Sequence, residues 1–364
     1  MSDTGEETRA SIGWLGWARV IAMVGVICIH VVGSNAVIAR EQPGLDATGL
    51  TATLIDFGFR WAAPLFVMAS GVTLLSAKHY PGDREFYGRR ASRLLPPLIF
   101  WHVVYALILY FFKNQPNPVS IMARILDGTL VAQLYFFWII LGLTLITPVL
   151  LPWVQQATLR QELAVGAGLT AAAILGTMIS GQGSAAAEGG RWEQTAATYW
   201  IPYLGYFLLG HALSRIRLTH FRGVVATVLA LLGTAVLVTQ WLYPWPWRHA
   251  EELAPAESYF HPAVPLVTCA VFIAARWLIS EDGWLAPLDR PKGADLGRRL
   301  GQASMGAFGV HLIVLDFARW VPPIGGDAAS ADVPQMLGRI AVVTVLSFAF
   351  ALVAGKVPGL RRVV

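Results

Sequence analysis

Long apolar runs separated by short polar segments follow one another along nearly the whole chain. A transmembrane helix needs roughly 20 mostly apolar residues, and most of these runs are long enough to cross a bilayer. Breaker segments rich in Pro, Gly and Asn, such as 115–118 and 322–326, lie between them. The pattern predicts an all-α fold, a polytopic transmembrane helix bundle in a single domain over residues 1–364, with 163–180 as its weakest span. We expect about ten spans, at residues 12–38, 53–77, 94–113, 131–153, 163–180, 197–213, 223–243, 263–279, 301–320 and 339–357.

The composition agrees with a membrane protein and excludes several other classes. Hydrophobic residues make up 55% of the chain and charged residues only 13%, whereas soluble domains have roughly 25% charged residues. Disordered, collagen-like and disulfide-rich classes are excluded, because apolar residues dominate and the two cysteines, Cys28 and Cys269, both lie in predicted spans. No Cys and His spacing indicates a metal site, and the net charge of +5 requires no nucleic acid partner.

The distribution of Lys and Arg between the loops predicts the orientation in the membrane. With the N-terminus in the cytoplasm, 17 of these residues fall on the cytoplasmic side and 7 on the other side. We therefore expect both termini in the cytoplasm, with residues 1–11 as a cytoplasmic leader and residues 78–93 as a basic cytoplasmic loop. The first apolar run is longer than the core of a signal peptide, so we interpret it as an uncleaved span.

Two ionisable residues lie in the first predicted span, Arg19 and His30. A charge near the bilayer centre costs about 2.5–3.5 kcal/mol on insertion scales, so such residues are often functional. Eleven helical steps turn the chain by about three turns and raise it by about 16 Å, which places both side chains on one face. In the structural alternative, Arg19 snorkels to the cytoplasmic interface and His30 is hydrogen-bonded inside the bundle.

Further ionisable residues fall at a similar depth in two other spans. Asp56 and Arg60 are four positions apart at the outer end of the second span, a spacing that favours an ion pair. The ninth span contains His311 and Asp316. Three spans with ionisable groups in the outer half of the membrane predict one wet cavity. For His102 and His211 we favour structural roles.

An arginine cluster, Arg89, Arg90 and Arg93, lies directly before the third span. The simplest interpretation is the usual excess of positive residues on the cytoplasmic side of a membrane protein. A cluster of this kind is also what bidentate binding of phosphate groups requires. Both interpretations remain open from the residues alone.

Four stretches resemble acyltransferase family 3, the integral membrane O-acyltransferases that depend on acyl-CoA. Each stretch is short, but together, in order and spaced along the ten predicted spans, they are specific for the family. Gln133-Leu134-Tyr135-Phe136 stands where the family usually has His-Leu-Trp-Phe. The four stretches are Arg19-x10-His30, Arg60-x3-Pro64-x5-Ser70-Gly71 continued by Phe86-Tyr87-x-Arg89-Arg90-x-x-Arg93, the Gln133 stretch, and Phe308-Gly309-Val310-His311-Leu312-Ile313.

The resemblance implies transfer of an acyl group, commonly acetyl, from cytoplasmic acetyl-CoA or another acyl-CoA to a hydroxyl. Acceptors in the family are sugars of cell-envelope glycans or their glycolipid precursors, and in some members macrolides. By matching motif positions, the resemblance implies that His30 is the essential histidine, that Arg19 is its partner, and that Arg89, Arg90 and Arg93 are the family's arginine group. It implies no metal. It places the chain in the bacterial inner membrane as a multi-pass protein in contact with lipids, and it is compatible with a homo-oligomer.

The residues permit a mechanism that agrees with this resemblance. We expect Arg89, Arg90 and Arg93 to bind the CoA phosphates, and Arg19 to guide the pantetheine arm toward His30. His30 then acts either as the general base for the attacking hydroxyl or as a transient acyl carrier. We expect Arg60 to stabilise the developing oxyanion, and Asp56 or Asp316 to orient an imidazole.

A transporter or a flippase of a lipid-linked sugar is the main alternative, because such proteins also bury ionisable residues in a cavity. The sequence has no inverted repeat and no matching pair of broken helices, which counts against it. A non-catalytic scaffold ranks third, because it gives no reason for so many charges at membrane depth.

Overall fold

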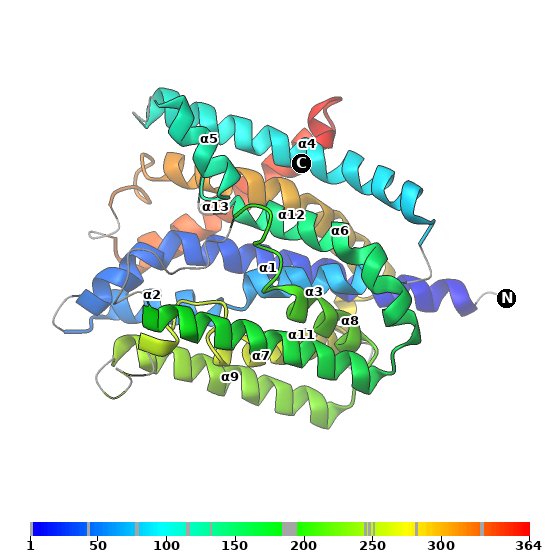
Figure 1. Ribbon diagram of the computed structural model, residues 1–364. Coiled ribbons are helices and arrows are strands. Elements are labelled where there is room, and N and C mark those ends of the chain that lie inside the picture. The colour runs from blue at the N-terminus through cyan, green and yellow to red at the C-terminus, as the bar shows by residue number, and fades with distance from the viewer. Residues whose placement is uncertain are drawn as a thin grey trace. The chain divides into compact units, whose positions relative to one another are not determined.

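The computed structural model of the chain is all-helical (Figure 1). Helices account for 78% of the structure, and the part of the chain that is described contains no strand. These residues are 3–41, 44–76, 80–113, 117–131, 133–183, 195–243, 246, 249, 252–280, 283–327 and 331–364, without the side chains of 3–12 and 180–183. The predicted all-α fold class is confirmed.

In the described part of the chain, eight helical segments are long and apolar enough to cross a membrane, and two shorter apolar helices, α8 and α11, bring the number of candidates to about ten. The predicted side of the termini stays a prediction. The helices are α1 (Asp3–Glu41), α2 (Ala47–Gly58), α3 (Ala62–Leu74), α4 (Asp83–Phe112), α5 (Pro118–Leu126), α6 (Tyr135–Gln156), α7 (Leu159–Gly183), α8 (Leu204–Ser214), α9 (His220–Leu242), α11 (Ala263–Ile279), α12 (Pro291–Ala318) and α13 (Val333–Ala354).

The weakest span is not the one that the sequence indicated. The segment predicted at 163–180 lies in α7, a regular helix of 25 residues. The segment predicted at 197–213 instead contains only α8, which has 11 residues. Residues 195–203 form turns held by local bonds: the backbone N–H of Thr195 donates to Thr198 Oγ1 (2.9 Å), and Trp200 Nε1 donates to Ala197 O (2.8 Å). Such local polar bonds compete with helix formation.

The predicted span 53–77 is broken in its middle. Helix α2 ends at Gly58, the chain turns at Phe59–Trp61, and α3 begins at Ala62. Pro64 explains the break, because it has no N–H to donate to the carbonyl of Arg60, and its ring would clash with that carbonyl in a continuous helix. The turn places Arg60 between two helices at membrane depth.

The basic segment predicted as a loop over 78–93 is helical from Asp83 onward, since α4 extends eleven residues beyond the predicted start of the third span at 94. Residues 77–79 lie outside the described part of the chain. Asp83 and Glu85 lie in the first turn of α4, where negative charge stabilises the helix dipole. The arginine cluster therefore projects from a helix.

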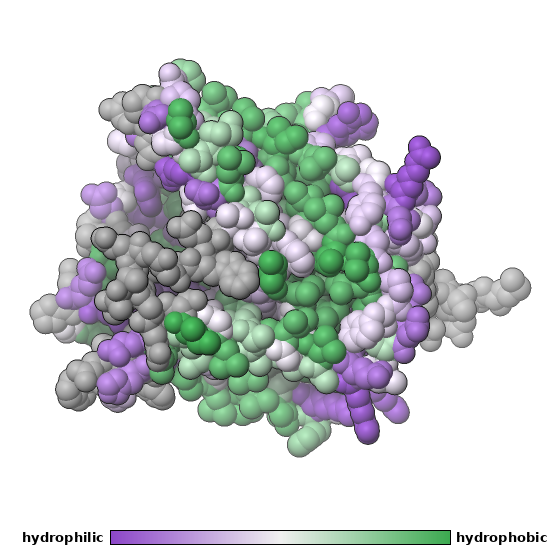
Figure 2. All heavy atoms as spheres, in the orientation of Figure 1, coloured by the Kyte–Doolittle hydropathy of each residue, from purple (hydrophilic) through white to green (hydrophobic). Residues whose placement is uncertain are grey.

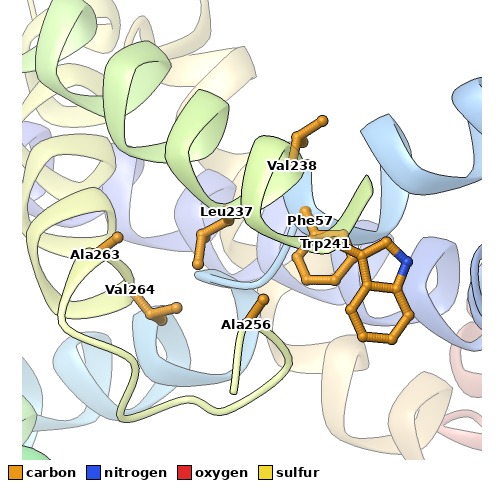
Figure 3. Packing of buried hydrophobic residues seen from close by; sticks show 7 residues of the cluster. All are labelled: Phe57, Leu237, Val238, Trp241, Ala256, Ala263 and Val264. Carbon is orange, nitrogen blue, oxygen red and sulfur yellow. The ribbon is translucent and has the colours of Figure 1, made fainter. Parts of the chain in front are cut away.

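The described helices form two compact units, which we treat separately. The first unit contains residues 1–66, 177–182 and 216–353, and the second contains residues 67–176, 183–215 and 354–364. In the first unit, α1 packs along α12, α9 packs on α11, and α2 contacts both α1 and α9. Phe57 of α2 and Trp241 of α9 belong to an apolar cluster there, with ring centroids 5.0 Å apart (Figure 3).

Helices α1 and α12 pack in parallel. Gly16 lies against the backbone of Gly297, and a Cβ at either glycine would collide with the neighbouring helix. Near the other end of the contact the rings of His30 and His311 meet. Both pairs are separated by the same 281 positions in the sequence, which defines one register along the two helices. Small residues thus allow α1 and α12 to approach closely.

In the second unit, α3 and α8 also meet through glycines. A Cβ on Gly71 would meet the backbone of Phe207, and a Cβ on Gly210 would meet the backbone of Met68. This reciprocal arrangement brings the two helix backbones into direct contact.

Many large apolar side chains of the described helices lie exposed on the protein surface. On α4, for example, Leu107 and Phe111 are 50% and 67% exposed, and on α9 Leu231 is 67% exposed. Figure 2 shows hydrophobic residues over much of one face. Exposed apolar surface on this scale is expected for helices that face lipid, and indicates a multi-pass membrane protein.

Candidate functional site

His30 and His311 form the centre of a candidate site in the first unit. His30 projects from α1 between buried neighbours, and its own side chain is partly accessible. Its ring centroid lies 5.2 Å from that of His311 on α12, and the two ring planes are inclined by 42°. The common register of the two helices brings these residues together, although they are far apart in the sequence.

The hydrogen bonds of His311 define its tautomer. This side chain is fully buried, and its Nδ1 lies 2.7 Å from the carbonyl oxygen of Phe308. A carbonyl oxygen only accepts hydrogen bonds, so Nδ1 carries the proton. In the neutral ring, Nε2 is then a bare acceptor, and it has no hydrogen-bond partner among the described residues.

Arg60 and Asp56 form the ion pair that their spacing predicted, with 2.8 Å between Arg60 Nη2 and Asp56 Oδ2. Arg60 Nη1 also donates to the carbonyl oxygen of Glu257 at 3.1 Å. The side chain of Arg60 is 14% exposed and that of Asp56 is 3% exposed. The charge of Arg60 interacts electrostatically with His30, so the structure brings three predicted site residues (His30, Arg60 and Asp56) into one electrostatic cluster.

Several buried polar atoms close to this ion pair have spare hydrogen-bonding capacity. Asp56 Oδ1 and Arg60 Nε have no partner among the described residues, and neither does the hydroxyl of Thr53, one turn before Asp56 on α2. Leaving a buried polar group unsatisfied costs about 1–3 kcal/mol. Because water or a polar ligand relieves this cost, the cluster is suited to bind a polar molecule.

The two other site residues predicted in this unit lie further along the same helices. Arg19 is partly buried on α1, eleven residues before His30, which corresponds to roughly 16 Å along the helix axis. Asp316 forms an ion pair with Arg319 at 3.6 Å, and 46% of its side chain is exposed. The roles predicted for Arg19 and Asp316 stay predictions.

The arginine cluster belongs to α4 in the second unit. Arg89 pairs with Glu85, one turn earlier, and 67% of its side chain is exposed. The guanidinium of Arg90 lies over the ring of Phe86, 5.5 Å from its centroid, and Arg93 is exposed. Arg89 and Arg93 lie on the same face of the helix, four residues apart, so they present two cations in the same direction.

Sequence reasoning did not include His311 among the site residues. It placed His311, with Asp316, among the ionisable groups of the ninth span that predict a wet cavity, but it gave His311 no role. The partner that suggests a role, His30, is 281 positions away in the sequence. The depth of both histidines in their predicted spans was the available signal.

The arrangement has the parts of a proton-transfer site. An imidazole can take a proton from a hydroxyl near neutral pH, and a guanidinium can stabilise negative charge that develops on oxygen. Comparison with known families gave a match over nearly the whole chain: the family model described as an acyltransferase domain matches residues 12–355. No curated protein and no solved structure matched the chain.

Proposed function

The chain belongs to this acyltransferase family, and on that premise we propose that it transfers an acetyl or other short acyl group from cytoplasmic acyl-CoA to a hydroxyl of a cell-envelope sugar or glycolipid. The observation that carries the proposal is the cluster of His30, His311, Arg60 and Asp56 inside a helical membrane protein of this family. We further propose that the protein lies in the bacterial inner membrane. Membrane lipids surround it there, and a homo-oligomer is compatible with the proposal.

In the proposed reaction the acceptor oxygen attacks the thioester carbonyl. A carbon–oxygen bond forms and the carbon–sulfur bond breaks, while the hydroxyl proton moves to His30 and then to the CoA thiolate. Arg60 stabilises the negative charge on the carbonyl oxygen in the transition state, and Asp56 holds Arg60 through the ion pair. If His30 is an acyl carrier instead, its ring nitrogen attacks the thioester carbonyl first, and the carbon–sulfur bond breaks to release the CoA thiolate. The acceptor oxygen then takes the acyl group as the carbon–nitrogen bond breaks, and the hydroxyl proton ends on the thiolate.

We propose that Arg89, Arg90 and Arg93 bind the phosphate groups of acyl-CoA, and that Arg19 guides the pantetheine arm. Exposure of Arg89 and Arg93 on one helix face supports this role, because both guanidinium groups are accessible to a ligand. Loss of one charged hydrogen-bond donor of this kind costs about 1.5–3 kcal/mol, which corresponds to roughly 10- to 100-fold in affinity.

The central test measures CoA release by the purified protein in lipid nanodiscs with acetyl-CoA and a thiol reagent. Candidate acceptors are cell-envelope glycans, a lipid-linked sugar and a macrolide. We expect acceptor-dependent release that His30→Ala abolishes and that His249→Ala, at an exposed histidine, leaves intact. Near-normal turnover by His30→Ala contradicts the role of His30.

The arginine group is tested by comparing KM values. We expect Arg93→Ala to raise the KM for acetyl-CoA about tenfold or more and to change the KM for the acceptor little. Arg84→Ala, at an exposed arginine near the start of α4, is the matched control. A larger effect on the acceptor than on acetyl-CoA would assign the cluster to membrane topology alone.

One observation favours the alternative of a transporter or flippase. The helix break at Phe59–Trp61 places Arg60 between two half-helices, and transporters bind substrates at such breaks. The same preparation distinguishes the two functions, because a transporter moves a lipid-linked sugar across the bilayer without CoA release. Flux in the absence of CoA release would replace the acyltransferase proposal.

A further inference from the structure

His311 has one satisfied and one unsatisfied ring nitrogen, both buried, and its ring lies beside the ring of His30. Nδ1 donates to the carbonyl of Phe308 at 2.7 Å, while Nε2 has no partner among the described residues. A buried acceptor without a partner is uncommon in proteins and calls for an explanation. The ring of His30, on α1, lies next to the ring of His311, with 5.2 Å between the two centroids.

His102 shows what a structural histidine looks like in the same protein. Its Nδ1 also donates to a backbone carbonyl of its own helix, that of Leu98, at 2.7 Å. Its Nε2, however, accepts a hydrogen bond from Trp138 Nε1 at 3.1 Å. Both nitrogens of His102 are therefore satisfied by the protein, whereas Nε2 of His311 has no partner among the described residues.

We propose that His311 is the positioning residue of His30: its bare Nε2 accepts the ring N–H of His30 when substrate is bound. The inference rests on the proposed function and adds a residue to it. Because the backbone bond to Phe308 holds the proton on Nδ1, His311 can only accept at Nε2 while it is neutral. His30 is thereby held in the tautomer whose other nitrogen presents a lone pair to the acceptor hydroxyl.

The same contact stabilises His30 after it has taken the proton. The acceptor O–H bond breaks, the proton binds the free nitrogen of His30, and the resulting imidazolium donates its original N–H to His311. The proton then leaves for the CoA thiolate, so His30 returns to its starting tautomer and His311 gains and loses nothing. Hydrogen bonds of this kind are often long before substrate binds, in agreement with the unbonded ring contact.

Two substitutions test the contributions of the two ring nitrogens of His311 separately. The side-chain amide of Asn reaches the position of Nδ1, so His311→Asn keeps a donor for Phe308 and removes the acceptor. The amide of Gln reaches the position of Nε2, so His311→Gln keeps an acceptor oxygen near His30. His102→Asn is the matched control for shortening a buried, helix-bonded histidine.

Acetyl transfer is measured in nanodiscs with the acceptor that supports CoA release by the unmodified protein. We expect His311→Asn to lower kcat about 100-fold, the lower end of the range for acid–base catalysis, with the KM for acetyl-CoA within twofold. We expect His311→Gln to recover at least tenfold of that loss, and His102→Asn to retain kcat within threefold. If His311→Asn does not fold, as judged by gel filtration, His311→Gln alone decides, with at least a tenth of the normal kcat expected.

The inference is overturned if the kcat of His311→Asn is within threefold of normal, or if the substitution changes only the KM. It is also overturned if the kcat of His311→Gln is no higher than that of His311→Asn. If His30→Ala abolishes transfer in the same experiment, the proposed function survives this failure. No CoA release by the unmodified protein with any acceptor, or undiminished release by His30→Ala, overturns both proposals.

Discussion

A buried carboxylate, Glu162, links two helices of the second unit. It lies on α7 with a side chain that is 0% exposed, and it accepts hydrogen bonds from His211 Nδ1 (2.6 Å) and Arg215 Nη1 (2.8 Å). The side chains of His211 and Arg215 are 14% and 41% exposed. Glu162→Gln removes the negative charge at nearly constant volume, so it tests the electrostatic part of this contact.

The expected loss of stability follows from the exposure of the two partners. The bond to His211 changes from charge-assisted to neutral, which costs about 1–1.5 kcal/mol, the difference between the two classes of hydrogen bond. Arg215 is partly exposed and regains water when it loses its ion pair, so that loss is limited to about 1 kcal/mol. Glu162→Gln is therefore expected to lower the free energy of unfolding by about 2–2.5 kcal/mol.

The assay is equilibrium unfolding in mixed micelles, followed by the fluorescence of the 14 tryptophans. A double-mutant cycle with Arg215→Gln should give a coupling energy of about 1 kcal/mol, and Arg160→Gln, at an exposed arginine of α7, is the control. An effect of Glu162→Gln within about 0.5 kcal/mol, the range of neutral surface changes, would refute the reasoning.

Three further predictions concern packing and catalysis. Gly71→Ala should destabilise the protein by about 1–3 kcal/mol, as for overpacking, because the new Cβ meets the backbone of Phe207. The control Gly168→Ala, on an open helix face, should be neutral or stabilising by up to about 1 kcal/mol. Equal effects of the two substitutions in thermal unfolding would contradict close packing of α3 on α8. Arg60→Gln should lower kcat for acetyl transfer about 100- to 1000-fold if it stabilises the oxyanion, and a change confined to KM in steady-state kinetics would exclude that role. Trp241→Phe should lower the free energy of unfolding by about 1–3 kcal/mol in the same assay, since Trp241 Nε1 donates a buried hydrogen bond to a backbone carbonyl of α1 at 3.0 Å. An unchanged unfolding midpoint would contradict this role of the hydrogen bond.

The fold followed from the sequence where a span is a single apolar run. Helix α11 has the predicted bounds, 263–279, because polar or helix-breaking residues, Pro262 and Ser280, stand directly beside the run. The broken span was missed because average hydropathy over 53–77 hides Pro64, whose effect on the helix is local. The early start of α4 was missed because only the apolar part of the helix was considered, although the acidic residues at its start favour a helix.

The candidate site was predictable only in part. Arg60 and Asp56 are four positions apart, so their ion pair depends on local geometry that the sequence contains. The contact between His30 and His311 depends on how two distant helices pack. Its register depends on the close approach at Gly16 and on the side chains around it, which a pattern along one chain does not reveal.

The parallel packing of α1 and α12 also restricts how the chain is threaded through the bilayer. Two neighbouring helices that cross in the same direction must be separated by an odd number of crossings. Among the residues that the structure describes, five long apolar helices lie between them, and the short helices α8 and α11 add none, one or two crossings. The number of crossings between α1 and α12 stays odd only if α8 and α11 both cross the membrane or if neither does. If each long helix of the described residues crosses once, the total with α13 is eight or ten, an even number. We therefore expect the start of α1 and the end of α13 on the same side of the membrane.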